Sequence, residues 1–355
     1  MHFLFNPEYL SGSSLSDFMK SLLVTGGAGF IGSNFINYIL SKRDDFFIVN
    51  VDKLTYAGNL ENLLRVEKNK NYNFVKGDIT NEELINYLFQ KYKFTHVINF
   101  AAESHVDRSI LGSEIFFQSN VLGTNTLLEC SKRHGLKKFV QISTDEVYGS
   151  LGSSGYFTEE TPLKPNSPYS ASKAAADMMA LSFHHTYGVP VVITRCSNNY
   201  GPFQFPEKLI PLMIINSIHN KKLPVYGDGL NIRDWIYVDD HSLAIELILE
   251  NSKDGEVYNI GASSEMTNIE IIKLILKHLQ KSEDLISFIK DRPGHDKRYA
   301  IDSTKIQHEI RWKPLHKFDE AITTTIDWYL ENSVWWKRIT SGEYRKYYEI
   351  QYSNN

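Results

Sequence analysis

The stretch TGGAGFIG at residues 25–32 decides how the rest of the sequence is interpreted. It follows a short apolar run at 21–25 and precedes an amphipathic stretch at 30–41. Glycines between a strand and a helix let the backbone turn tightly and approach a pyrophosphate, which then lies at the positive N-terminus of the helix. A glycine turn alone is a weak signal, but here an acidic residue, Asp52, ends the next apolar run about twenty residues further on. The stretch therefore predicts a dinucleotide-binding site.

The carboxylate of Asp52 also predicts which dinucleotide binds. A carboxylate at the end of the second strand accepts hydrogen bonds from the ribose diol of an adenosine and repels a 2′-phosphate. We therefore expect NAD rather than NADP. Asp78, which follows the third predicted strand, is placed to approach the adenine.

Strands and helices alternate along the chain from residue 21. Short apolar runs, typical of strands buried on both faces, occur at 21–25, 47–52, 72–76, 96–100, 139–143, 191–195 and 257–260. Helical stretches lie between them at 30–41, 80–92, 112–134 and 168–187. This alternation predicts an α/β fold, namely a Rossmann-type, doubly wound parallel sheet with helices on both faces and right-handed connections.

The alternation loosens after residue 196, where prolines become frequent. Further helices are predicted at 207–219, 239–250 and 268–280, and an aromatic-rich stretch follows at 328–336. We predict an NAD-binding domain at 19–196, to which 231–261 returns, and a smaller mixed α/β substrate lobe at 197–230 and 262–355. The active site is expected in the cleft between them. Residues 1–18 are interpreted as a poorly ordered extension or as sequence before a true start at Met19, with a functional arm as the alternative.

The composition excludes several classes of protein. The chain of 355 residues carries 38 Lys and Arg against 42 Asp and Glu, a formal charge of −4, which argues against nucleic acid as a partner. No apolar run reaches the roughly 18–20 residues of a membrane-spanning helix, and no signal peptide is recognisable, so we expect a cytoplasmic protein with no membrane partner. Cys130 and Cys196 match no zinc pattern and the 12 histidines are scattered, so we expect buried thiols and no metal site.

Tyr169 and Lys173 form a second pattern that carries chemistry. They lie four residues apart on a predicted helix, so their side chains share one face. The ordinary pKa of a phenol is about 10, too high for a base at neutral pH. A neighbouring ammonium and a nicotinamide cation lower the pKa of a phenol. We therefore predict that Lys173 lowers the pKa of Tyr169, and that Tyr169 acts as a base.

Thr144, Asp145 and Glu146 follow the fifth predicted strand. Open α/β sheets bind ligands at the carboxyl ends of their strands, so these side chains should lie near Tyr169. Two adjacent carboxylates on an exposed helix are often only a solvated first turn. In a cleft they become an acid and base pair, one protonated and one ionised.

These motifs together resemble those of a known family. The glycine turn, Thr144 and the Tyr169–Lys173 pair are similar to those of the extended short-chain dehydrogenase/reductase superfamily. Within it, the sequence resembles the dTDP-glucose 4,6-dehydratases over residues 20–340. The blocks that carry this resemblance are AAESHVDRS (101–109), TDE (144–146), RCSNNYGP (195–202), YGDG (226–229) continuing through RDW (233–235), and RPGHD (292–296). Met266, where a Lys is more usual, and residues 1–18 depart from the pattern.

The resemblance implies a hydro-lyase that converts dTDP-glucose to dTDP-4-keto-6-deoxyglucose with NAD, in the biosynthesis of deoxysugars such as rhamnose. Tyr169 would remove the proton of the 4-hydroxyl while a hydride leaves C4 for NAD. Thr144 would orient the 4-oxygen, and Lys173 would bind the nicotinamide ribose. Glu146 would then remove the C5 proton and Asp145 would protonate the departing 6-hydroxyl, before the hydride returns to C6.

The resemblance also implies the ligand contacts. Expected cofactor-binding residues are Gly26, Gly29, Phe30, Ile31, Gly32, Asp52, Lys53, Thr55, Asp78, Ile79, Ala101, Ala102, Ser104, Tyr169 and Lys173. Expected substrate-binding residues are Ser104, His105, Thr144, Asn198, Glu207, Lys208, Leu209, Ile210, Tyr226, Arg233, Asn268, Arg292 and His295. Arg233 and Arg292 suit a diphosphate, because a guanidinium binds phosphate bidentately.

The family further implies a homodimer in which the helices at 112–134 and 168–187 form a four-helix bundle. Their apolar faces carry Leu122, Leu127, Leu128, Met178, Met179, Leu181 and Phe183. Packing within a single chain would explain the same residues, so the sequence leaves both interpretations open.

Three other functions stay open at this point. A UDP-sugar 4-epimerase shares the fold, NAD and the Tyr–Lys pair, but has no use for two carboxylates beside the tyrosine. A UDP-glucose 4,6-dehydratase shares the dehydration chemistry, and no residue spacing distinguishes thymidine from uridine. A nucleotide-binding protein without activity would usually lack Tyr169 or Lys173.

Overall fold

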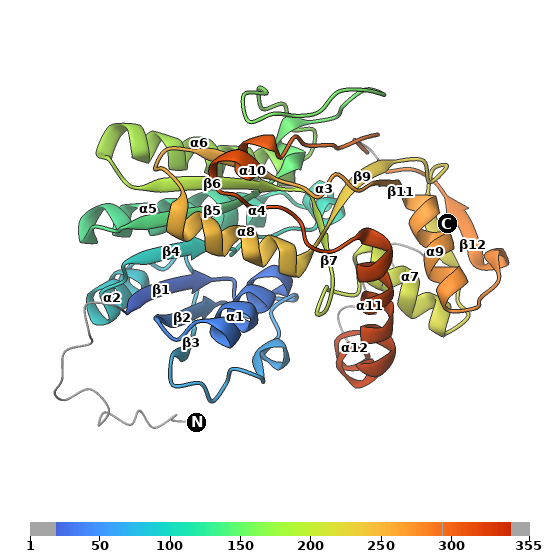
Figure 1. Ribbon diagram of the computed structural model, residues 1–355, viewed down its shortest axis with the longest axis horizontal. Coiled ribbons are helices and arrows are strands. Elements are labelled where there is room, and N and C mark those ends of the chain that lie inside the picture. The colour runs from blue at the N-terminus through green and yellow to red at the C-terminus, as the bar shows by residue number, and fades with distance from the viewer. Residues whose placement is uncertain (1–18, 293, 342–355) are drawn as a thin grey trace.

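Among residues 19–292 and 294–341, which the computed structural model describes, seven parallel strands form one large sheet (Figure 1). They are β1 (Lys20–Thr25), β2 (Phe46–Asp52), β3 (Tyr72–Lys76), β4 (His96–Asn99), β5 (Lys138–Thr144), β6 (Val191–Cys196) and β10 (Val257–Ile260). Their order in the sheet is β10-β6-β5-β4-β1-β2-β3. The strand order reverses beside β1, as in doubly wound dinucleotide-binding folds, so the predicted fold class is confirmed.

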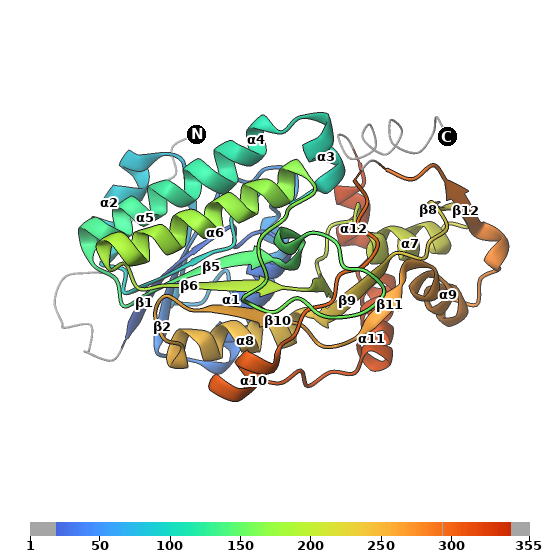
Figure 2. The same cartoon turned by 90° about the horizontal axis from the view of Figure 1, so that it is seen from above.

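The strand β1 shows why these strands are unbroken apolar runs in the sequence. Leu22 and Val24 belong to the core on one face of the sheet and Leu23 to the core on the other, and all three are fully buried. The first face is covered by α1 (Phe30–Lys42), α8 (Val238–Asn251) and α10 (Thr304–Glu309), and the second by α2 (Glu82–Tyr92), α5 (Gly123–His134) and α6 (Pro168–Tyr187) (Figure 2). A sheet buried on both faces leaves its strand ends as the place for ligands.

The helix predicted at 112–134 is not uniform. After α3 (Val106–Leu111), it begins as α4 (Glu114–Phe116), passes through the π-helical segment η2 (Phe117–Leu122) and continues as α5. Asn120 in the π-helical segment is buried, and its side chain accepts from the backbone N–H of Glu103 and donates to the hydroxyl of Ser172, both at 2.8 Å. The segment therefore ties the loop after β4 to α6, the helix that carries Tyr169 and Lys173.

A smaller unit lies beside the large sheet, at the right of Figure 1. Its strands β7 (Asn198–Tyr200), β9 (Ile232–Tyr237) and β11 (Glu265–Thr267) form one sheet, and β8 (Leu223–Tyr226) pairs with β12 (Ile286–Ile289). Its helices are α7 (Leu209–Ile218), α9 (Asn268–His278), α11 (Phe318–Glu331) and α12 (Ser333–Ile339). The short 3₁₀ turn η4 (Glu283–Leu285) lies in this unit between α9 and β12, and the turns η1 (Leu60–Leu63) and η3 (Asp145–Tyr148) lie elsewhere. The sequence analysis predicted α7 and α9 but none of these strands, because polar residues or a proline interrupt each of them and leave no unbroken apolar run.

The chain crosses between the two units several times. β9 pairs within the smaller unit, whereas α8 and β10 belong to the large sheet and its cover. Residues 304–312, which the sequence analysis assigned to the smaller lobe, instead pack on the large sheet, with Ile306, Ile310 and Trp312 in the core beneath α1 and α8. The division into domains otherwise stays a prediction, and the predicted extension at 1–18 lies outside the described residues.

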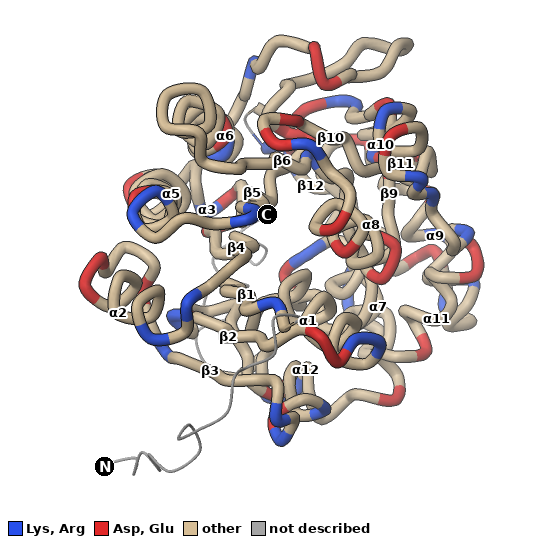
Figure 3. The backbone as a smooth tube through the Cα atoms, turned by 60° about the vertical axis from the view of Figure 1, so that its left-hand side comes forward, with Lys and Arg blue, Asp and Glu red and all other residues tan. Residues whose placement is uncertain are grey.

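Acidic and basic residues are interspersed along the outer elements (Figure 3). Across the described residues, no helix is both long enough and apolar enough to cross a membrane. The same part of the chain contains no group of three or more His, Cys, Asp or Glu arranged to hold a metal ion. Cys130 and Cys196 are buried free thiols, as predicted.

Candidate active site

The glycine turn at 25–32 forms the entrance to α1. Gly26 has a φ of +68°, and a Cβ at this position would lie 2.6 Å from the backbone nitrogen of Ala101. A Cβ at Gly32 would lie 2.5 Å from the carbonyl oxygen of Gly26. At Gly29, by contrast, a Cβ would meet only one atom, at 3.3 Å. Gly26 and Gly32 are therefore required by close packing, while Gly29 leaves the start of the helix open to a pyrophosphate.

Asp52 ends β2 beside this turn. Its carboxylate accepts hydrogen bonds from the backbone N–H groups of Ala28 (2.9 Å) and Leu54 (2.8 Å). Burial raises the pKa of this carboxyl group, and the two hydrogen bonds oppose the rise. Asp52 thus fixes the turn while it also lines the pocket described next.

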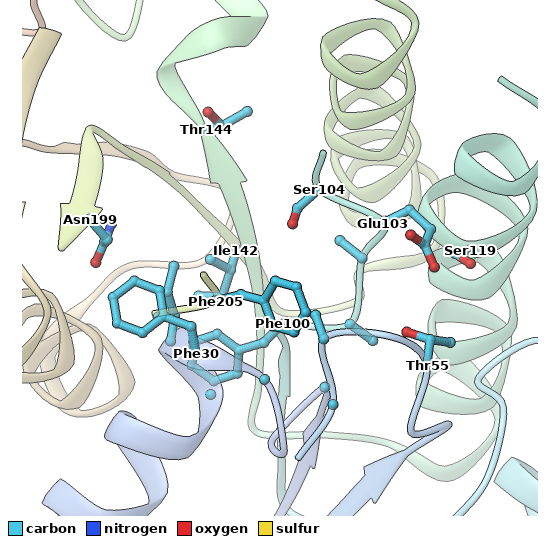
Figure 4. A pocket seen from close by; sticks show the side chains of 18 of the residues that line it. Phe30, Thr55, Phe100, Glu103, Ser104, Ser119, Ile142, Thr144, Asn199 and Phe205 are labelled. Carbon is cyan, nitrogen blue, oxygen red and sulfur yellow. The ribbon is translucent and has the colours of Figure 1, made fainter. Parts of the chain in front are cut away.

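A pocket of about 310 Å³ extends from the glycine turn along the carboxyl ends of the strands (Figure 4). Every residue predicted to bind NAD lines it. It is also lined by the catalytic candidates Thr144, Asp145, Glu146, Tyr169 and Lys173, and by the substrate candidates Ser104, Asn198, Glu207 and Lys208. The fold therefore brings the residues predicted to bind the cofactor and the residues predicted to carry out the reaction into one cavity.

The sequence analysis missed several residues of this pocket. Figure 4 shows Glu103 and Ser119 on one side and Asn199 on the other. Tyr56 also lines the pocket, and the guanidinium of Arg108 lies over its ring, 3.9 Å from the ring centroid. Glu103 lies inside the block AAESHVDRS, so the sequence carried a signal that could have identified it as a site residue. Ser119 belongs to no motif and gave none.

Tyr169 and Lys173 lie in the first turns of α6, on its buried face. The helix start is well defined, because Ser167 forms a capping box and a proline occupies the first position. The Tyr169 hydroxyl lies near the side chain of Thr144 at the end of β5, which lowers the pKa of the phenol. Nζ of Lys173 donates to the carbonyl oxygen of Ile142, also in β5, at 2.6 Å. The strand therefore orients both side chains.

The pKa of Tyr169 departs from the sequence prediction. Burial raises it well above its ordinary value, the negative charge of Glu146 raises it further, and the nearby side chain of Thr144 opposes the rise. Lys173 donates its hydrogen bond to β5 instead, and burial lowers its own pKa. The predicted lowering by Lys173 is therefore not found, because desolvation outweighs the attraction of one ammonium.

Asp145 and Glu146 open the turn η3, and Thr144 caps it. The hydroxyl of Thr144 accepts from the backbone N–H of Glu146 and donates to Oδ1 of Asp145, both at 3.3 Å. Asp145 is 1% exposed, and its Oδ2 has no hydrogen-bond partner among the described residues. Burial raises the pKa of Asp145 well above its ordinary value, and the charges of Glu146 and Asp234 raise it further.

Glu146 lies in a different electrostatic environment. Burial raises the pKa of its carboxyl group as it does for Asp145, but the cations Arg292, Arg233 and Lys208 each oppose this rise. The environment therefore favours a protonated Asp145 beside a Glu146 whose ionised form is stabilised by cations. Such a difference between neighbouring carboxyls marks an acid and a base.

Three predicted substrate residues gather around Asp107, a residue of α3 for which the sequence analysis had no role. Asp107 accepts from Nη1 of Arg292 through Oδ1 and from the Tyr226 hydroxyl through Oδ2, both at 3.1 Å. The ring of His295 meets that of Tyr226 edge-on, with the centroids 6.0 Å apart. Asp107 therefore joins the large unit to a cationic part of the smaller one.

Arg233 occupies the neighbouring strand β9. Its guanidinium lies 4.4 Å from the ring centroid of Tyr299, and Nη2 donates to the carbonyl oxygen of Asp296 at 2.9 Å. The positive charge of Arg233 acts on both Asp145 and Glu146. Arg233 thus links the acid–base pair with the segment around Asp296.

The remaining substrate candidates have less direct positions. Nε2 of His105 lies 3.6 Å from Glu207. Leu209 and Ile210 begin α7, and Ile210 is fully buried in the core of the smaller unit. Asn268 begins α9 and donates its backbone N–H to the carbonyl oxygen of Asn231 at 3.1 Å. Among the described residues, eight substrate candidates do not line the pocket: His105, Leu209, Ile210, Tyr226, Arg233, Asn268, Arg292 and His295.

Comparisons with known proteins identify the family. The model of the GDP-mannose 4,6 dehydratase family matches residues 23–325. A probable dTDP-glucose 4,6-dehydratase from Sinorhizobium fredii (strain NBRC 101917 / NGR234) is 52% identical over 342 residues, which cover 91% of this chain and 97% of the relative. The chain belongs to the dTDP-glucose 4,6-dehydratases.

Solved structures of dTDP-glucose 4,6-dehydratases agree with this assignment. The enzyme from Bacillus anthracis str. Ames, in complex with NAD, is 51% identical with a TM-score of 0.85, and the match covers 90% of this chain and 99% of that one. The enzyme from Streptomyces venezuelae, with NAD and dTDP bound, is 46% identical with a TM-score of 0.87 and the same coverage. A UDP-glucose 4-epimerase from Thermotoga maritima shares the fold with a TM-score of 0.82, but at 29% identity over 88% of this chain and 99% of that one.

Proposed function

We propose that this protein converts dTDP-glucose to dTDP-4-keto-6-deoxyglucose and water, with NAD as its cofactor. The observation that carries the proposal is the pair of a buried Asp145 and a half-buried Glu146, which line one pocket with Tyr169 and the glycine turn. An oxidation followed by return of the hydride needs only the tyrosine and the dinucleotide. Two further carboxyls in unlike environments fit an elimination of water.

The residues around the glycine turn fit NAD. The start of α1 is open at Gly29, and the Asp52 carboxylate lies at the end of β2, where a ribose diol is bound in this fold. When bound, NAD supplies a hydride acceptor for C4 of the hexose and a hydride donor for C6. Tyr169 and Lys173 line the same pocket at the end of β5, so the sugar is expected to lie against them.

Tyr169 takes the proton of the 4-hydroxyl in the oxidation step. Its hydroxyl lies near Thr144, whose side chain also faces the pocket and orients the 4-oxygen. Because burial raises the pKa of Tyr169, the phenolate needs a positive charge beside it at the moment of reaction. Lys173 holds the end of β5 and the ribose side of the pocket in place through its bond to Ile142.

Glu146 and Asp145 carry out the elimination. The ketone at C4 acidifies the C5 hydrogen, and Glu146 removes it. Asp145 donates its proton to the 6-hydroxyl, which leaves as water and creates a C5–C6 double bond. The proton held by Glu146 returns to C5 when a hydride reaches C6. The raised pKa of Asp145 keeps it protonated for its role, and the cations around Glu146 stabilise the ionised form that a base requires.

Arg233 and Arg292 are proposed to bind the diphosphate of the substrate. Neither lines the pocket described above, but the positive charge of each acts on Glu146, and guanidinium groups bind phosphate oxygens bidentately. Lys208 adds a third charge from the start of α7. The predicted contacts of Ser104, Asn198 and Glu207 with the sugar stay proposals of the same kind.

Parallel incubations with dTDP-glucose and UDP-glucose, followed by mass spectrometry, test this function. The expected product is dTDP-glucose lighter by one water, formed faster than any product of UDP-glucose. A product of unchanged mass with inverted C4 would support the epimerase alternative. Faster water loss from UDP-glucose would overturn the nucleotide assignment.

We also propose a homodimer through the outer side of α3 to α6. Exposed apolar side chains on these elements are Ile110, Leu111, Ile115, Phe117, Leu122 and Met178. Leu127, Leu128 and Phe183, which the sequence analysis placed on the pairing faces, belong instead to the core of the large sheet. Sedimentation equilibrium tests the pairing, and a species of 40.8 kDa alone would exclude it. The cytoplasmic location stays a prediction.

A further inference from the structure

Trp335, in the last described helix, is connected by hydrogen bonds to the glycine turn. Its indole N–H donates to Oδ1 of Asn62 at 2.8 Å, and Nδ2 of Asn62 donates to the carbonyl oxygen of Ala28 at 3.0 Å. All three residues are buried, with Asn62 2% and Trp335 7% exposed. Ala28 lies between Gly26 and Gly29 and donates its own N–H to Asp52. The indole therefore fixes the amide that holds the turn.

Trp335 also reaches the opposite wall of the pocket, by a separate route. Its ring packs on Phe203 at a centroid distance of 5.8 Å, and Trp328 of α11 packs on the same ring at 4.9 Å. The next two residues, Gln204 and Phe205, line the pocket. The tryptophans therefore pack against residues 201–207, a segment that contributes Gln204, Phe205 and Glu207 to the lining of the pocket.

This segment adopts a conformation that needs such support. Phe203 has a φ of +65°, a region that bulky side chains rarely occupy. Residues in such conformations persist only where their surroundings fix them. The segment is also bound by Asn34 of α1, which donates to the carbonyl oxygen of Pro202 at 2.9 Å, and by the hydroxyl of Tyr329, which donates to the carbonyl oxygen of Gln204. The strain is thus borne by α1 and by the helices α11 and α12.

We propose that Trp335 is a positioning residue for the cofactor, which sets the width of the NAD pocket by fixing both of its walls. None of these connections passes through a catalytic residue. We therefore expect Trp335 to affect the binding of NAD rather than the chemistry. The proposal rests on the NAD site described above. It adds Trp335 as a residue that supports this site, although Trp335 lies about 270 residues after its partner Asn62 in the sequence.

The substitution Trp335→Phe removes the N–H donor and keeps an aromatic ring. It leaves Oδ1 of Asn62 buried without its partner, so the amide loses its fixed orientation and the carbonyl of Ala28 keeps only the backbone N–H of Asn59 as a fixed donor. We expect the dissociation constant for NAD, measured by isothermal titration calorimetry, to rise about tenfold, because an unmade buried hydrogen bond commonly costs this much. The value of kcat at saturating NAD is expected to change by less than about twofold, because no reacting group moves.

Two matched controls separate positioning from general loosening. Trp336→Phe removes a buried indole donor from the same helix, but its partner is the carbonyl oxygen of Tyr329 in α11, at 2.8 Å. Trp312→Phe removes a third buried indole donor, whose partner is the carbonyl oxygen of Asp240 at 3.0 Å. Both controls are expected to lower the melting temperature as Trp335→Phe does, while NAD affinity stays within about twofold of the wild type.

A second variant keeps the proposal testable if Trp335→Phe does not fold. Asn62→Asp retains an acceptor for the indole N–H but has no donor for the carbonyl of Ala28. It should weaken NAD binding by a similar factor, and the double variant should be no weaker than either single one, because both break the same connection. Unchanged NAD affinity in Trp335→Phe or Asn62→Asp, or equal losses in all three tryptophan variants, would overturn the inference. A wild-type protein that does not bind NAD would instead overturn the proposed function.

Discussion

The two halves of the active site are built in different ways. The cofactor half consists of backbone and small residues that follow consecutive strands: the glycine turn after β1, Asp52 at the end of β2, and Ala101 and Ala102 after β4. The sugar half consists of charged side chains from distant segments, among them Asp107, Glu146 and Arg292. The first is specified by local geometry, and the second by the tertiary fold.

The halves also differ in how well their polar groups are satisfied. In the cofactor half, both carboxylate oxygens of Asp52 accept backbone hydrogen bonds. In the sugar half, Oδ2 of Asp145 and Oε1 of Glu207 are buried without a hydrogen-bond partner in the described chain. Burial raises the pKa of Asp145, Glu146 and Glu207. Unsatisfied groups of this kind are costly to the fold and are typical of sites that hold a reacting ligand.

The largest expected effect is the loss of elimination when both carboxyls become amides. In Asp145→Asn/Glu146→Gln, water loss should slow by about 10⁴-fold or more, because acid and base groups each contribute about 10²–10⁴-fold. Neither side chain contacts the glycine turn, so NAD should bind as in the wild type and reduced nicotinamide should accumulate in a single turnover. Rapid quenching followed by mass spectrometry measures the water loss.

The control for this variant is Asp254→Asn, which removes a carboxylate paired with Lys138 at 2.6 Å, outside the pocket. It should dehydrate substrate at the wild-type rate. Water loss at that rate in the double amide variant would falsify the assignment of Asp145 and Glu146.

The next largest effect should fall on the step that precedes elimination. Tyr169→Phe should slow the oxidation at C4 by about 10²–10⁴-fold, so that reduced nicotinamide no longer forms in a single turnover. Tyr148→Phe is the matched control, because it also removes a buried hydroxyl, here one that donates to Asn259 at 2.8 Å. A Tyr148→Phe variant as slow as Tyr169→Phe would indicate a loss of folding rather than of a base.

The same contrast explains how much the sequence could predict. All the strands of the large sheet were predicted, since unbroken apolar runs and a glycine turn are local signals. Tyr169 and Lys173 were predicted from their helical spacing together with their place after a nucleotide-binding turn and the fifth strand. Asp107 was missed although it lies in a recognised block, because its role depends on Tyr226 and Arg292, more than a hundred residues further on. Burial raises the pKa of Tyr169, and the sequence analysis did not include this cause, because burial is a property of the fold and has no pattern in the sequence.

A smaller effect should distinguish the two halves by affinity. Asp107→Asn removes the charge that holds Arg292 and keeps a similar shape, so the guanidinium loses its fixed orientation toward the diphosphate. The KM for dTDP-glucose should rise about tenfold, a typical loss for a hydrogen bond to a charged group, while kcat changes little and NAD affinity stays unchanged. Steady-state kinetics and NAD titration measure these quantities.

Arg292→Lys tests whether Asp107 acts through the guanidinium. The double variant with Asp107→Asn should have a KM close to that of Arg292→Lys alone, because the two substitutions break one interaction. A KM that multiplies both single effects would show that Asp107 acts on the substrate by another route.

The smallest expected effect concerns stability, and it follows from the raised pKa of Asp145. As pH rises above the ordinary value of 3.8, the unfolded chain ionises this carboxyl first, while the folded chain keeps it protonated. The wild type therefore loses stability with rising pH from that value up to the raised folded pKa, where the loss levels off. Asp145→Asn has no such loss, so its melting temperature should exceed that of the wild type by an amount that grows with pH to about 2–4 °C. Thermal unfolding at several pH values measures the difference, with Asp254→Asn as the control that should show no growing gain. A difference that is independent of pH would mean that the folded protein holds Asp145 as a carboxylate, and the assignment of this residue as the acid would then be lost although the fold and the cofactor half remained unaffected.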